Sequence, residues 1–352
     1  MSDGLFEVRC VLVAIACLTS SAVNAQVKYV GGINAGEPLV RIVADPVRGK
    51  VYGIADNGDI LFMDRATLSV EKKIATGRKL TDIDVSADGS FMTVLDNVTR
   101  EYWNQPPSTY VLKFDLQSQS QSGITLVQSP LFHMALGRQN RITGVAVNQW
   151  VNVYQDDATT GAQLSTTSGG YFGSGSTDWQ TLTLVSNPAG TRMFRTDIGI
   201  SSIEVMAFDT STDTITGAGA RTVGSYTTEP VYINSSGTSL YVGDLRLNPN
   251  NLQQTLGIFP ENIYAATGND TLAFGANNVY DPTWGNVLQA MPVHSTQLTM
   301  GQFDQYLYAW DGGTNRVQVM EVPEPGGTGL VAAGAAAMCL RRRRRWAGRP
   351  GR

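Results

Sequence analysis

LVRIVADPVRGKVYGIADNGDILFMDRATLSVEKKIAT, residues 39–76, contains four short runs rich in β-branched and aromatic residues. The runs are LVRIVADP (39–46), VYGIADN (51–57), ILFMDRA (60–66) and LSVEKKIAT (68–76), with turns at VRGK and at Gly58. Short apolar runs cut by Gly, Asp and Asn are typical of β-strands. Because the connections are too short for crossovers, the stretch predicts a four-stranded antiparallel meander.

The pattern restarts several times along the chain. TDIDVS (81–86), a turn at ADGS (87–90) and FMTVLDN (91–97) begin a second unit, which continues after an insertion with YVLKFDLQ (110–117). Later echoes are LTLVSNPAGTRMFRTDI (182–198), IEVMAFDTS (203–211), EPVYINSSGTSLYVGD (229–244) and NVYDPTWGNVLQAM (278–291). The last of these repeats the DPxxGxV spacing of Asp45 to Val51. The body of the chain is therefore an array of similar all-β units.

The spacing of the turns identifies the architecture. The comparable turn positions are Asp45, Asp88, Asn187, Asn234 and Asp281, which give three intervals of 43, 47 and 47 residues. The remaining gap of 99 residues fits one further repeat near VAVNQWVNVY (145–154). A period of about forty to fifty residues with four strands in each repeat is typical of a β-propeller blade. One blade cannot bury both of its faces, whereas a ring of blades can.

The two ends of this region predict how the ring closes. TQLTMGQFDQYLYAWDGGTNRVQVMEV (296–322) reads as three strands, and VKYVGG (27–32) can supply the fourth. This closure removes exposed sheet edges. Residues 245–275 have no clear assignment, and the 23 residues between Asp281 and Asp304 are too few for a blade. We expect an all-β, seven-bladed propeller of four-stranded antiparallel blades over residues 26–322, with six blades as the alternative.

The N-terminus has the outline of a secretory signal peptide over residues 1–25. Arg9 precedes the apolar run CVLVAIACL (10–18), and the small residues Val23 and Ala25 precede a cleavage point at Gln26. A buried helix or strand at the start of the fold is the alternative. All three cysteines lie at positions 10, 17 and 339, so a processed chain has no thiol and no disulfide.

The C-terminus, residues 323–352, has three consecutive parts. Val322-Pro323-Glu324-Pro325 is followed by fourteen apolar or small residues from Gly327 to Leu340. Then come five arginines: Arg341, Arg342, Arg343, Arg344 and Arg345. The apolar stretch is short for a hydrocarbon core of about 30 Å, and the arginines favour a cytoplasmic C-terminus. This pattern predicts a short transmembrane helix that holds the protein temporarily, as in signals whose hydrophobic tail is later removed.

These three parts in this order resemble the PEP-CTERM sorting signal of Gram-negative bacteria. The resemblance covers about the last thirty residues and implies that an exosortase recognises Pro323, Glu324 and Pro325. It further implies export with signal peptidase, transient anchoring in the inner membrane, and delivery to the cell surface or extracellular matrix. The turn and strand from Ser86 to Val94 are similar to YVTN-type propellers of bacterial surface proteins. WAGRPGR (346–352) departs from the family pattern by continuing past the arginines.

Charge excludes one class of partner. Removing residues 1–25 and 326–352 takes away eight of the 26 basic and two of the 30 acidic residues. The remaining 18 basic and 28 acidic residues give a net charge of −10. We therefore expect no non-specific binding of nucleic acid or anionic lipid.

Few residues suggest catalysis or metal binding. The chain has two histidines, His133 and His294, and no HExxH, GxSxG, P-loop or cysteine-pair zinc pattern. Asp82, Asp84 and Asp88 in DIDVSADG are the best metal candidates, because alternating carboxylates near a turn can ligate calcium. The favoured interpretation is a strand with a polar face that carries Asp82 and Asp84, followed by an Asp-Gly turn. We therefore predict no cofactor and leave calcium as an alternative.

Aromatic residues in long connections are the candidate ligand-binding residues. Trp103 lies in the insertion before Pro106-Pro107, and Tyr171 and Trp179 lie in the Gly/Ser-rich segment 166–179. Rings at a propeller rim can stack on sugars, or they can fold back over the core. We expect a non-catalytic binding or structural protein that engages exopolysaccharide. A calcium-dependent propeller hydrolase or lactonase is the alternative.

Overall fold

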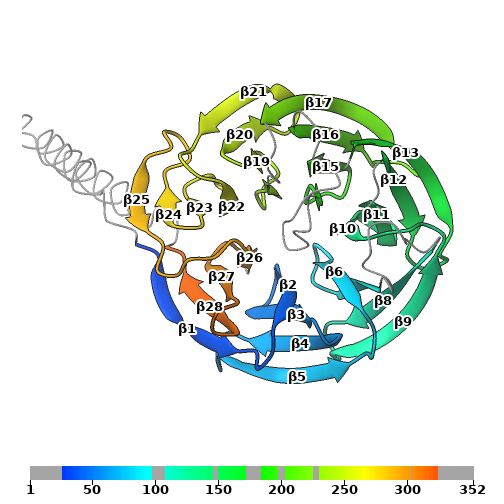
Figure 1. The fold of residues 1–352 in the computed structure, drawn as a ribbon, viewed down its shortest axis with the longest axis horizontal. Coiled ribbons are helices and arrows are strands. Elements are labelled where there is room, and N and C mark those ends of the chain that lie inside the picture. Colours follow the sequence, from blue (N-terminus) through cyan, green and yellow to red (C-terminus); the bar gives the residue numbers. More distant parts are fainter. Residues whose placement is uncertain are drawn as a thin grey trace, which may run out of the picture. The chain divides into compact units, whose positions relative to one another are not determined.

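Seven four-stranded antiparallel sheets are arranged around a common axis (Figure 1). The computed structural model describes residues 26–96, 108–145, 150–171, 184–196, 203–224, 230–301 and 303–323. The residues from Lys28 to Val322 form one compact unit, and every sheet lies within it. The prediction of a seven-bladed propeller with four-stranded antiparallel blades is confirmed, and the six-bladed alternative is wrong.

We number the blades 1 to 7 by the order of their innermost strands along the chain. The innermost strands are β2 (Leu39–Ala44), β6 (Leu80–Val85), β10 (His133–Leu136), β14 (Leu184–Ser186), β18 (Val231–Ile233), β22 (Ile263–Ala266) and β26 (Leu298–Gly301). The second strands are β3 (Lys50–Ala55), β7 (Phe91–Asp96), β11 (Arg141–Val145), β15 (Arg192–Thr196), β19 (Leu240–Val242), β23 (Ala273–Gly275) and β27 (Tyr306–Asp311). A single 3₁₀ turn, Arg138–Asn140, joins β10 to β11 in the described chain.

The outer strands follow the same order of blades. The third strands are β4 (Asp59–Asp64), β8 (Thr109–Asp115), β12 (Trp150–Asp157), β16 (Ile203–Asp209), β20 (Leu245–Asn248), β24 (Asn278–Tyr280) and β28 (Arg316–Glu321). The outermost strands are β5 (Ser69–Ala75), β9 (Ser120–Val127), β13 (Gln163–Tyr171), β17 (Thr216–Gly224), β21 (Asn251–Ile258), β25 (Val287–Ala290) and β1 (Lys28–Asn34).

Blade 7 is built from both ends of the unit. β1 pairs antiparallel with β28, from Lys28 opposite Glu321 to Asn34 opposite Arg316. The N-terminal strand thus supplies the fourth strand that 296–322 lacks, as predicted. Because the blade needs both chain ends, the ring closes without an additional sheet edge.

The core lies between neighbouring blades. Tyr52 and Phe62 of blade 1 pack with Val94 and Phe114 of blade 2, and all four are fully buried. A similar cluster joins blade 7 to blade 1, where Ile33 of β1 is also fully buried. Since each such side chain contributes about 1.5–3 kcal/mol on burial, the blade interfaces hold the ring together.

A repeated turn connects the first and second strands of five blades. The residue immediately after the innermost strand donates its main-chain N–H to the carbonyl five residues later, and its side-chain oxygen accepts main-chain N–H groups of the same turn. These residues are Asp45, Ser86, Asn187, Asn234 and Thr267. Gly89 and Asp270 occupy the same turn position with φ of 65° and 55°. The turn therefore depends on a short polar side chain rather than on one residue type.

Two sequence equivalences are wrong. Asp88 lies two residues after Ser86, the true counterpart of Asp45. Asp281 lies in the turn between β24 and β25, at the outer side of blade 6, and the counterpart of Asp45 in that blade is Thr267. The reason is shared chemistry: Asp281 Oδ1 accepts the N–H of Thr283 just as Asp45 Oδ1 accepts the N–H of Val47. An Asp-Pro sequence can therefore form either the turn between the first and second strands or the turn between the third and fourth strands.

The closing strand provides a test of this architecture. Ile33→Ala should lower the free energy of unfolding by about 2–4 kcal/mol, because the cavity opens at the only blade assembled from both chain ends. Chemical denaturation followed by far-UV circular dichroism measures this change. Val30→Ala, at a half-exposed position of the same strand, is the control and should change stability by less than about 1 kcal/mol. Equal effects of the two variants would contradict the role of β1 in closure.

Candidate functional site

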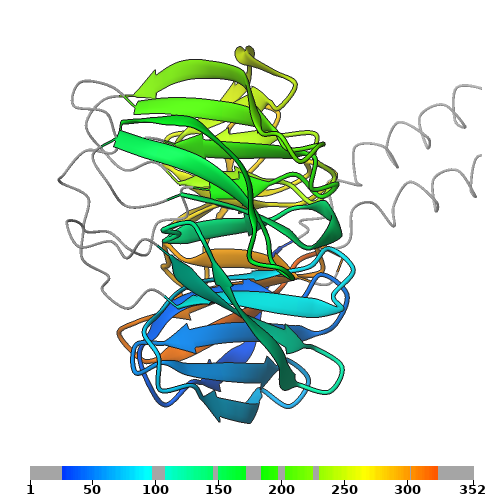
Figure 2. The same cartoon turned by 90° about the vertical axis from the view of Figure 1, so that its right-hand side faces the viewer.

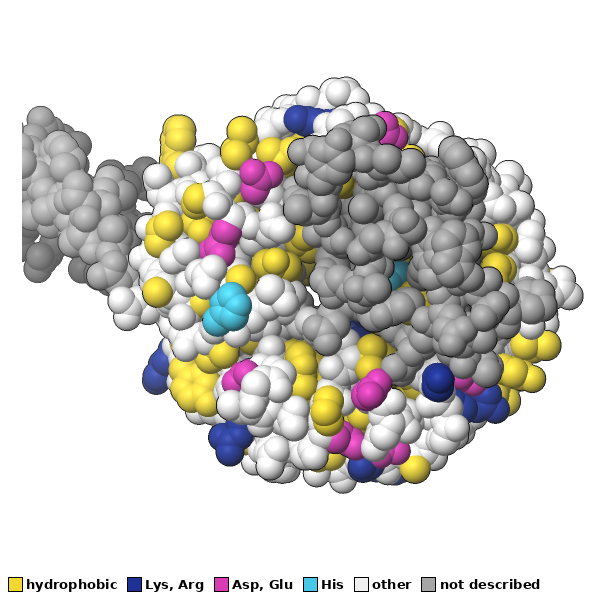
Figure 3. Space-filling model, viewed as in Figure 1, with side chains coloured by type: hydrophobic (Ala, Val, Ile, Leu, Met, Phe, Trp, Pro, Cys, Tyr) yellow, Lys and Arg dark blue, Asp and Glu magenta, His cyan; other side chains and the backbone are white. Residues whose placement is uncertain are grey.

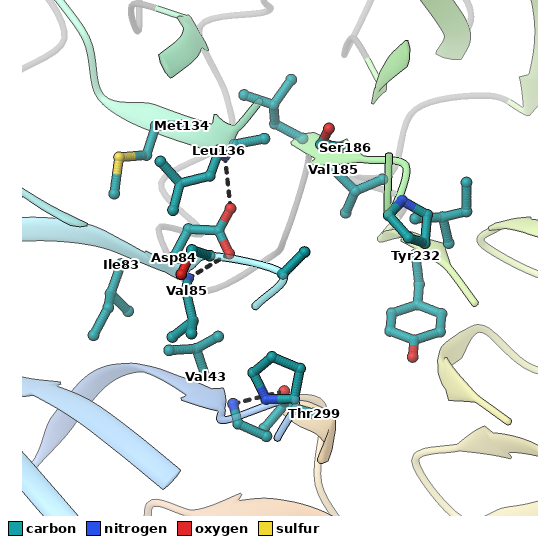
Figure 4. Close-up of a pocket in the computed structure, with 18 of the residues that line it drawn as sticks. Val43, Ile83, Asp84, Val85, Met134, Leu136, Val185, Ser186, Tyr232 and Thr299 are labelled. Carbon is teal, nitrogen blue, oxygen red and sulfur yellow. Dashed lines mark hydrogen bonds between the residues drawn. The ribbon is translucent and has the colours of Figure 1, made fainter. Parts of the chain in front are cut away.

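A cavity of about 700 Å³ lies on the propeller axis and is lined by the innermost strands (Figure 4). Its wall is mostly apolar and includes Val43, Val85, Leu136 and Val185. The ring of Tyr232 and the carboxylate of Asp84 also line the cavity. The lining continues to the first-to-second-strand turns, where it includes Pro46, Asp88, Pro188 and Ser235. The axis therefore offers a concave, mostly apolar site among the described residues.

Asp82 is the centre of a buried charged cluster. Its Oδ1 lies 2.9 Å from Nε of Arg41, and its Oδ2 accepts the main-chain N–H of Met134 at 2.8 Å. Nδ1 of His133 lies 3.5 Å from Oδ2 of Asp82 and 3.4 Å from Nη2 of Arg41. Burial alone would raise the pKa of Asp82, but the charge of Arg41 and hydrogen bonds to its carboxylate hold this pKa below its usual value. The charged side chain of Asp82 thus links blade 2 to blade 1 by an ion pair and to blade 3 by a hydrogen bond.

His133 is the neutral member of this cluster. Burial lowers its pKa, and the positive charges of Arg41 and Arg195 lower it further, against the raising effect of Asp82. The histidine therefore sits uncharged between an arginine and a carboxylate. Removing one partner of the Arg41–Asp82 pair would leave a buried charge uncompensated, which typically costs about 3–5 kcal/mol.

Asp84 lies two residues nearer the turn on the same strand and faces the cavity. Its Oδ2 accepts the N–H of Leu136 at 2.7 Å, and its Oδ1 accepts the N–H of Val85 at 2.8 Å (Figure 4). Burial and the nearby charge of Asp82 raise the pKa of Asp84 to about 7, although both hydrogen bonds act in the opposite direction. The two aspartates of one strand therefore have opposite pKa shifts.

The same type of bond joins other blades at the axis. Thr299 Oγ1 of blade 7 accepts the N–H of Ala44 of blade 1 at 3.1 Å, and Gln297 Nε2 donates to the carbonyl of Val40 at 3.3 Å. Like Asp82 and Asp84, these side chains reach from one innermost strand to the main chain of the next. An innermost strand has no neighbour on its axial edge, so its unpaired main-chain groups need such partners.

Asp88 is separate from Asp82 and Asp84. Its Oδ1 accepts hydrogen bonds from Ser86 Oγ and from the N–H and Oγ of Ser90, all within the turn. These bonds lower the pKa of Asp88. Among the described residues, no group of three or more His, Cys, Asp or Glu side chains is placed to hold a metal ion. The three predicted calcium candidates serve a strand-to-strand contact and a turn.

Two of the three predicted sugar-binding residues belong to segments that connect strands. Trp103 and Trp179 lie outside the described residues, and Tyr171 is the last residue of β13. Segment 97–107 connects the second and third strands of blade 2, and segment 172–183 connects the fourth strand of blade 3 to the first of blade 4. In an antiparallel blade these two kinds of connection leave from the same side, opposite the first-to-second-strand turns. We call this side the loop face and the opposite side the turn face.

The predicted processing sites fall at the ends of the described chain. Gln26 and Pro323 are the first and last described residues. The other predicted processing residues, Ala25, Glu324 and Pro325, and the arginines at 341–345 lie outside the described residues. Within the described ranges, no helical segment has the length and hydropathy of a membrane span.

The sequence interpretation missed Arg41 and His133 as partners of Asp82. All three lie four residues before the end-of-strand position that begins the turn, in blades 1, 2 and 3. Counting back from Asp45, Ser86 and Gly137 would have aligned an arginine, an aspartate and a histidine in consecutive blades. The sequence therefore contained the information needed to align Arg41, Asp82 and His133. Using it requires knowing at which residue each turn begins.

Asp84 provides a pH test. Because its pKa is raised by folding, its contribution to stability is complete below about pH 4 and is lost as the pH rises towards 7. Relative to wild type, Asp84→Asn should therefore gain about 1–3 kcal/mol of unfolding free energy between pH 4 and pH 8. Denaturant unfolding at a series of pH values measures the difference. Asp88→Asn is the matched control, and its difference from wild type should stay flat over the same range; a flat Asp84→Asn curve would contradict the assignment.

No family model matches this sequence, and no curated protein matches it. Solved structures do resemble the fold. The β-propeller domain of Cps50 (Swd1) from Myceliophteria thermophila has a TM-score of 0.61 at 14% identity, covering 84% of this chain and all of that one. The WD40 repeats of RRP9 give 0.60 at 10% identity, covering 84% and 100% of the two chains. Hydrazine synthase from Kuenenia stuttgartiensis gives 0.59 at 13% identity, covering 82% and 97%. At such identities the likeness is one of fold alone, the β-propeller.

Proposed function

We propose that this chain is exported, sorted through its C-terminal Pro-Glu-Pro signal, and works at the cell surface or in the extracellular matrix as a non-catalytic binding or structural propeller. Signal peptidase and an exosortase act on it during export, and residues 323–352 anchor it transiently in the inner membrane by a short helix. The ligand in this proposal is exopolysaccharide.

The observation that carries the proposal is the position of the chain ends. Lys28 and Glu321 pair at the junction of the third and fourth strands of blade 7, which belongs to the turn face. The connections that contain Trp103 and Trp179 leave from the loop face. The two ends of the ring-forming chain and the ends of the strands that flank segments 97–107 and 172–183 therefore belong to opposite faces of the propeller.

The axial residues support binding rather than catalysis. Asp82 is engaged by Arg41 and by the main chain of blade 3, and Asp84 accepts two main-chain N–H groups. Carboxylates used in this way hold the ring together. In the part of the chain that the structure describes, no arrangement of acids favours the calcium-dependent hydrolase or lactonase.

Intact mass of the native protein tests the sorting proposal. Inner membrane, outer envelope and extracellular matrix are separated, and the protein is purified from each. We expect a species that begins at Gln26 and ends near Pro325, recovered outside the inner membrane. A chain that keeps residues 326–352 and remains in the inner membrane would overturn the sorting proposal.

Two substitutions test the ligand. Trp103→Ala and Trp179→Ala should each weaken binding of the host's own exopolysaccharide by about fivefold to tenfold, because ring stacking is worth roughly 1 kcal/mol. Isothermal titration calorimetry measures the affinity, with circular dichroism as a check of the fold. Trp284→Ala removes an exposed tryptophan elsewhere and is the matched control. Unchanged affinity in both loop variants would remove these connections as the binding site.

A further inference from the structure

The wall of the axial cavity combines a wide apolar surface with a carboxylate. Val43, Val185 and the ring of Tyr232 line the cavity and are only partly buried, so an apolar body that enters would contact them (Figure 4). Asp84 is also partly exposed and lies on the side of the cavity opposite Tyr232. The cavity volume of about 700 Å³ is in the range of small-molecule sites, which hold a ligand by apolar contact and orient it with few polar groups.

The carboxylate of Asp84 can accept more hydrogen bonds than the protein provides. Its Oδ2 accepts the N–H of Leu136 and its Oδ1 accepts the N–H of Val85, whereas an ionised carboxylate offers about four acceptor positions. Arg41 forms its ion pair with Asp82 instead. Among the described side chains, no cation forms an ion pair with Asp84. The carboxylate therefore has acceptor positions to spare and no positive partner in the described chain.

A second acceptor belongs to Gln297, which lines the cavity at the start of blade 7. This residue is only 8% exposed, and its Nε2 donates to the carbonyl of Val40 at 3.3 Å. Its Oε1 is buried and has no hydrogen-bond partner among the residues that the structure describes. Because a buried acceptor without a partner is unfavourable, a donor placed beside it is stabilised.

Hydroxyl groups of the wall direct their hydrogen atoms to other protein groups. Tyr232 donates to the carbonyl of Ala266 at 3.2 Å, and Ser235 donates to Asp304 at 2.9 Å. The carboxylate and amide oxygens described above are acceptors. The wall therefore favours a ligand that donates hydrogen bonds.

The charged side chains of the lining give the cavity an excess of negative charge. Among the described residues, three aspartates and two arginines line it, which gives a net charge of −1 when all are ionised: Asp82, Asp84, Asp88, Arg41 and Arg138. On the face drawn in Figure 3, by contrast, acidic side chains are spread around the ring with hydrophobic side chains between them. The cavity brings a carboxylate and an apolar wall together in one concave site, which matches a cation with an apolar body.

We propose that the axial cavity binds a small organic amine, whose ammonium group donates hydrogen bonds to Asp84 and whose apolar body packs on Val185 and Tyr232. An ammonium group carries three N–H donors and one positive charge, so it matches both the free acceptors and the charge of the lining. This site is distinct from the one in the proposed function. Exopolysaccharide was assigned to the loop-face connections, whereas the lining of the cavity extends to the turns of the turn face.

The affinity for an amine should rise with pH between 6 and 8. Burial and the charge of Asp82 raise the pKa of Asp84 to about 7, so the carboxylate that pairs with the ammonium forms over this range. An alkylammonium keeps its proton there, because its pKa is about 10. The other charged or titratable groups around Asp84 are Arg41 on β2, Asp82 on β6, His133 on β10, and Asp88 and Arg138 in the turns. The pKa values of the two other aspartates and of the histidine are lowered, and the arginines stay charged, so Asp84 alone changes charge.

Three ligands of similar shape test the proposal by isothermal titration calorimetry on the full chain. Phenethylamine is a cation, phenethyl alcohol is neutral and hydrocinnamate is an anion. At pH 8 we expect one phenethylamine per chain, bound about tenfold or more tightly than the alcohol, because a hydrogen bond to a charged group is stronger than a neutral one. Hydrocinnamate should bind most weakly. From pH 6 to pH 8 the affinity for phenethylamine should rise about fivefold to tenfold, and that for the alcohol should stay constant.

Substitutions in the lining locate the site. Asp84→Asn should remove both the preference for the amine and its pH dependence. Asp88→Asn is the matched control: it removes another aspartate of the lining, whose Oδ1 is used within its own turn, and should change the amine affinity by less than about twofold. Val185→Phe narrows the cavity and should weaken binding of the amine and the alcohol alike. Circular dichroism checks the fold of each variant.

The outcomes are distinct. Equal affinity for phenethylamine and phenethyl alcohol at pH 8, a preference for the amine that survives in Asp84→Asn, or no binding of the amine would each overturn the proposal. Should Asp84→Asn fail to fold, the three ligands and the pH dependence of the wild type still decide it. None of these results changes the exopolysaccharide proposal, which is tested separately with Trp103→Ala and Trp179→Ala.

Discussion

The pairing of β1 with β28 is the interaction on which the rest of the propeller depends. It joins Lys28–Asn34 to Arg316–Glu321 across almost the whole length of the described chain. Without it, blade 7 would have three strands and blade 1 would lose the partner of its buried face, where Ile33 and Val319 pack with Val51 and Leu61. Every other blade is local in sequence, so this one ladder turns a linear array into the ring of Figure 1, which Figure 2 shows from the side.

A ring creates a second constraint at its axis, because seven innermost strands each present an unpaired edge to the centre. Sheet-to-sheet hydrogen bonds are not available there. Side chains instead provide hydrogen-bond partners for the main-chain groups of the innermost strands. Asp82 and Asp84 accept N–H groups of blade 3, while Thr299 and Gln297 form hydrogen bonds with the main chain of blade 1. A carboxylate that forms such a bond places a negative charge where it is largely shielded from water. Arg41 offsets the charge of Asp82, and Asp84 responds with a raised pKa.

The sequence predicted the fold well where the repeats are strong. The first two strands of blades 1 and 2 are each six residues long with clear apolar runs, and the Asp88-Gly89 turn marks the boundary between two of them. The inner strands of blade 6 were not predicted from the sequence, because they are only three or four residues long and rich in Ala and Gly, as in Ala273–Gly275. The partners of Asp82 and Asp84 could not be predicted from composition, because they are main-chain groups 52 residues away in the next blade. Only the ring geometry brings them together.

The place of β28 within blade 7 has a mechanical consequence. β28 is the last strand in the described part of the chain, yet it lies between β27 and β1 rather than at the edge of its sheet. Tension applied to the C-terminal segment therefore enters a strand that is held by hydrogen-bonded ladders on both sides. The strand cannot be unzipped one bond at a time from a free edge; both ladders must slide together. A load applied through the tail is therefore resisted first by the two ladders of blade 7.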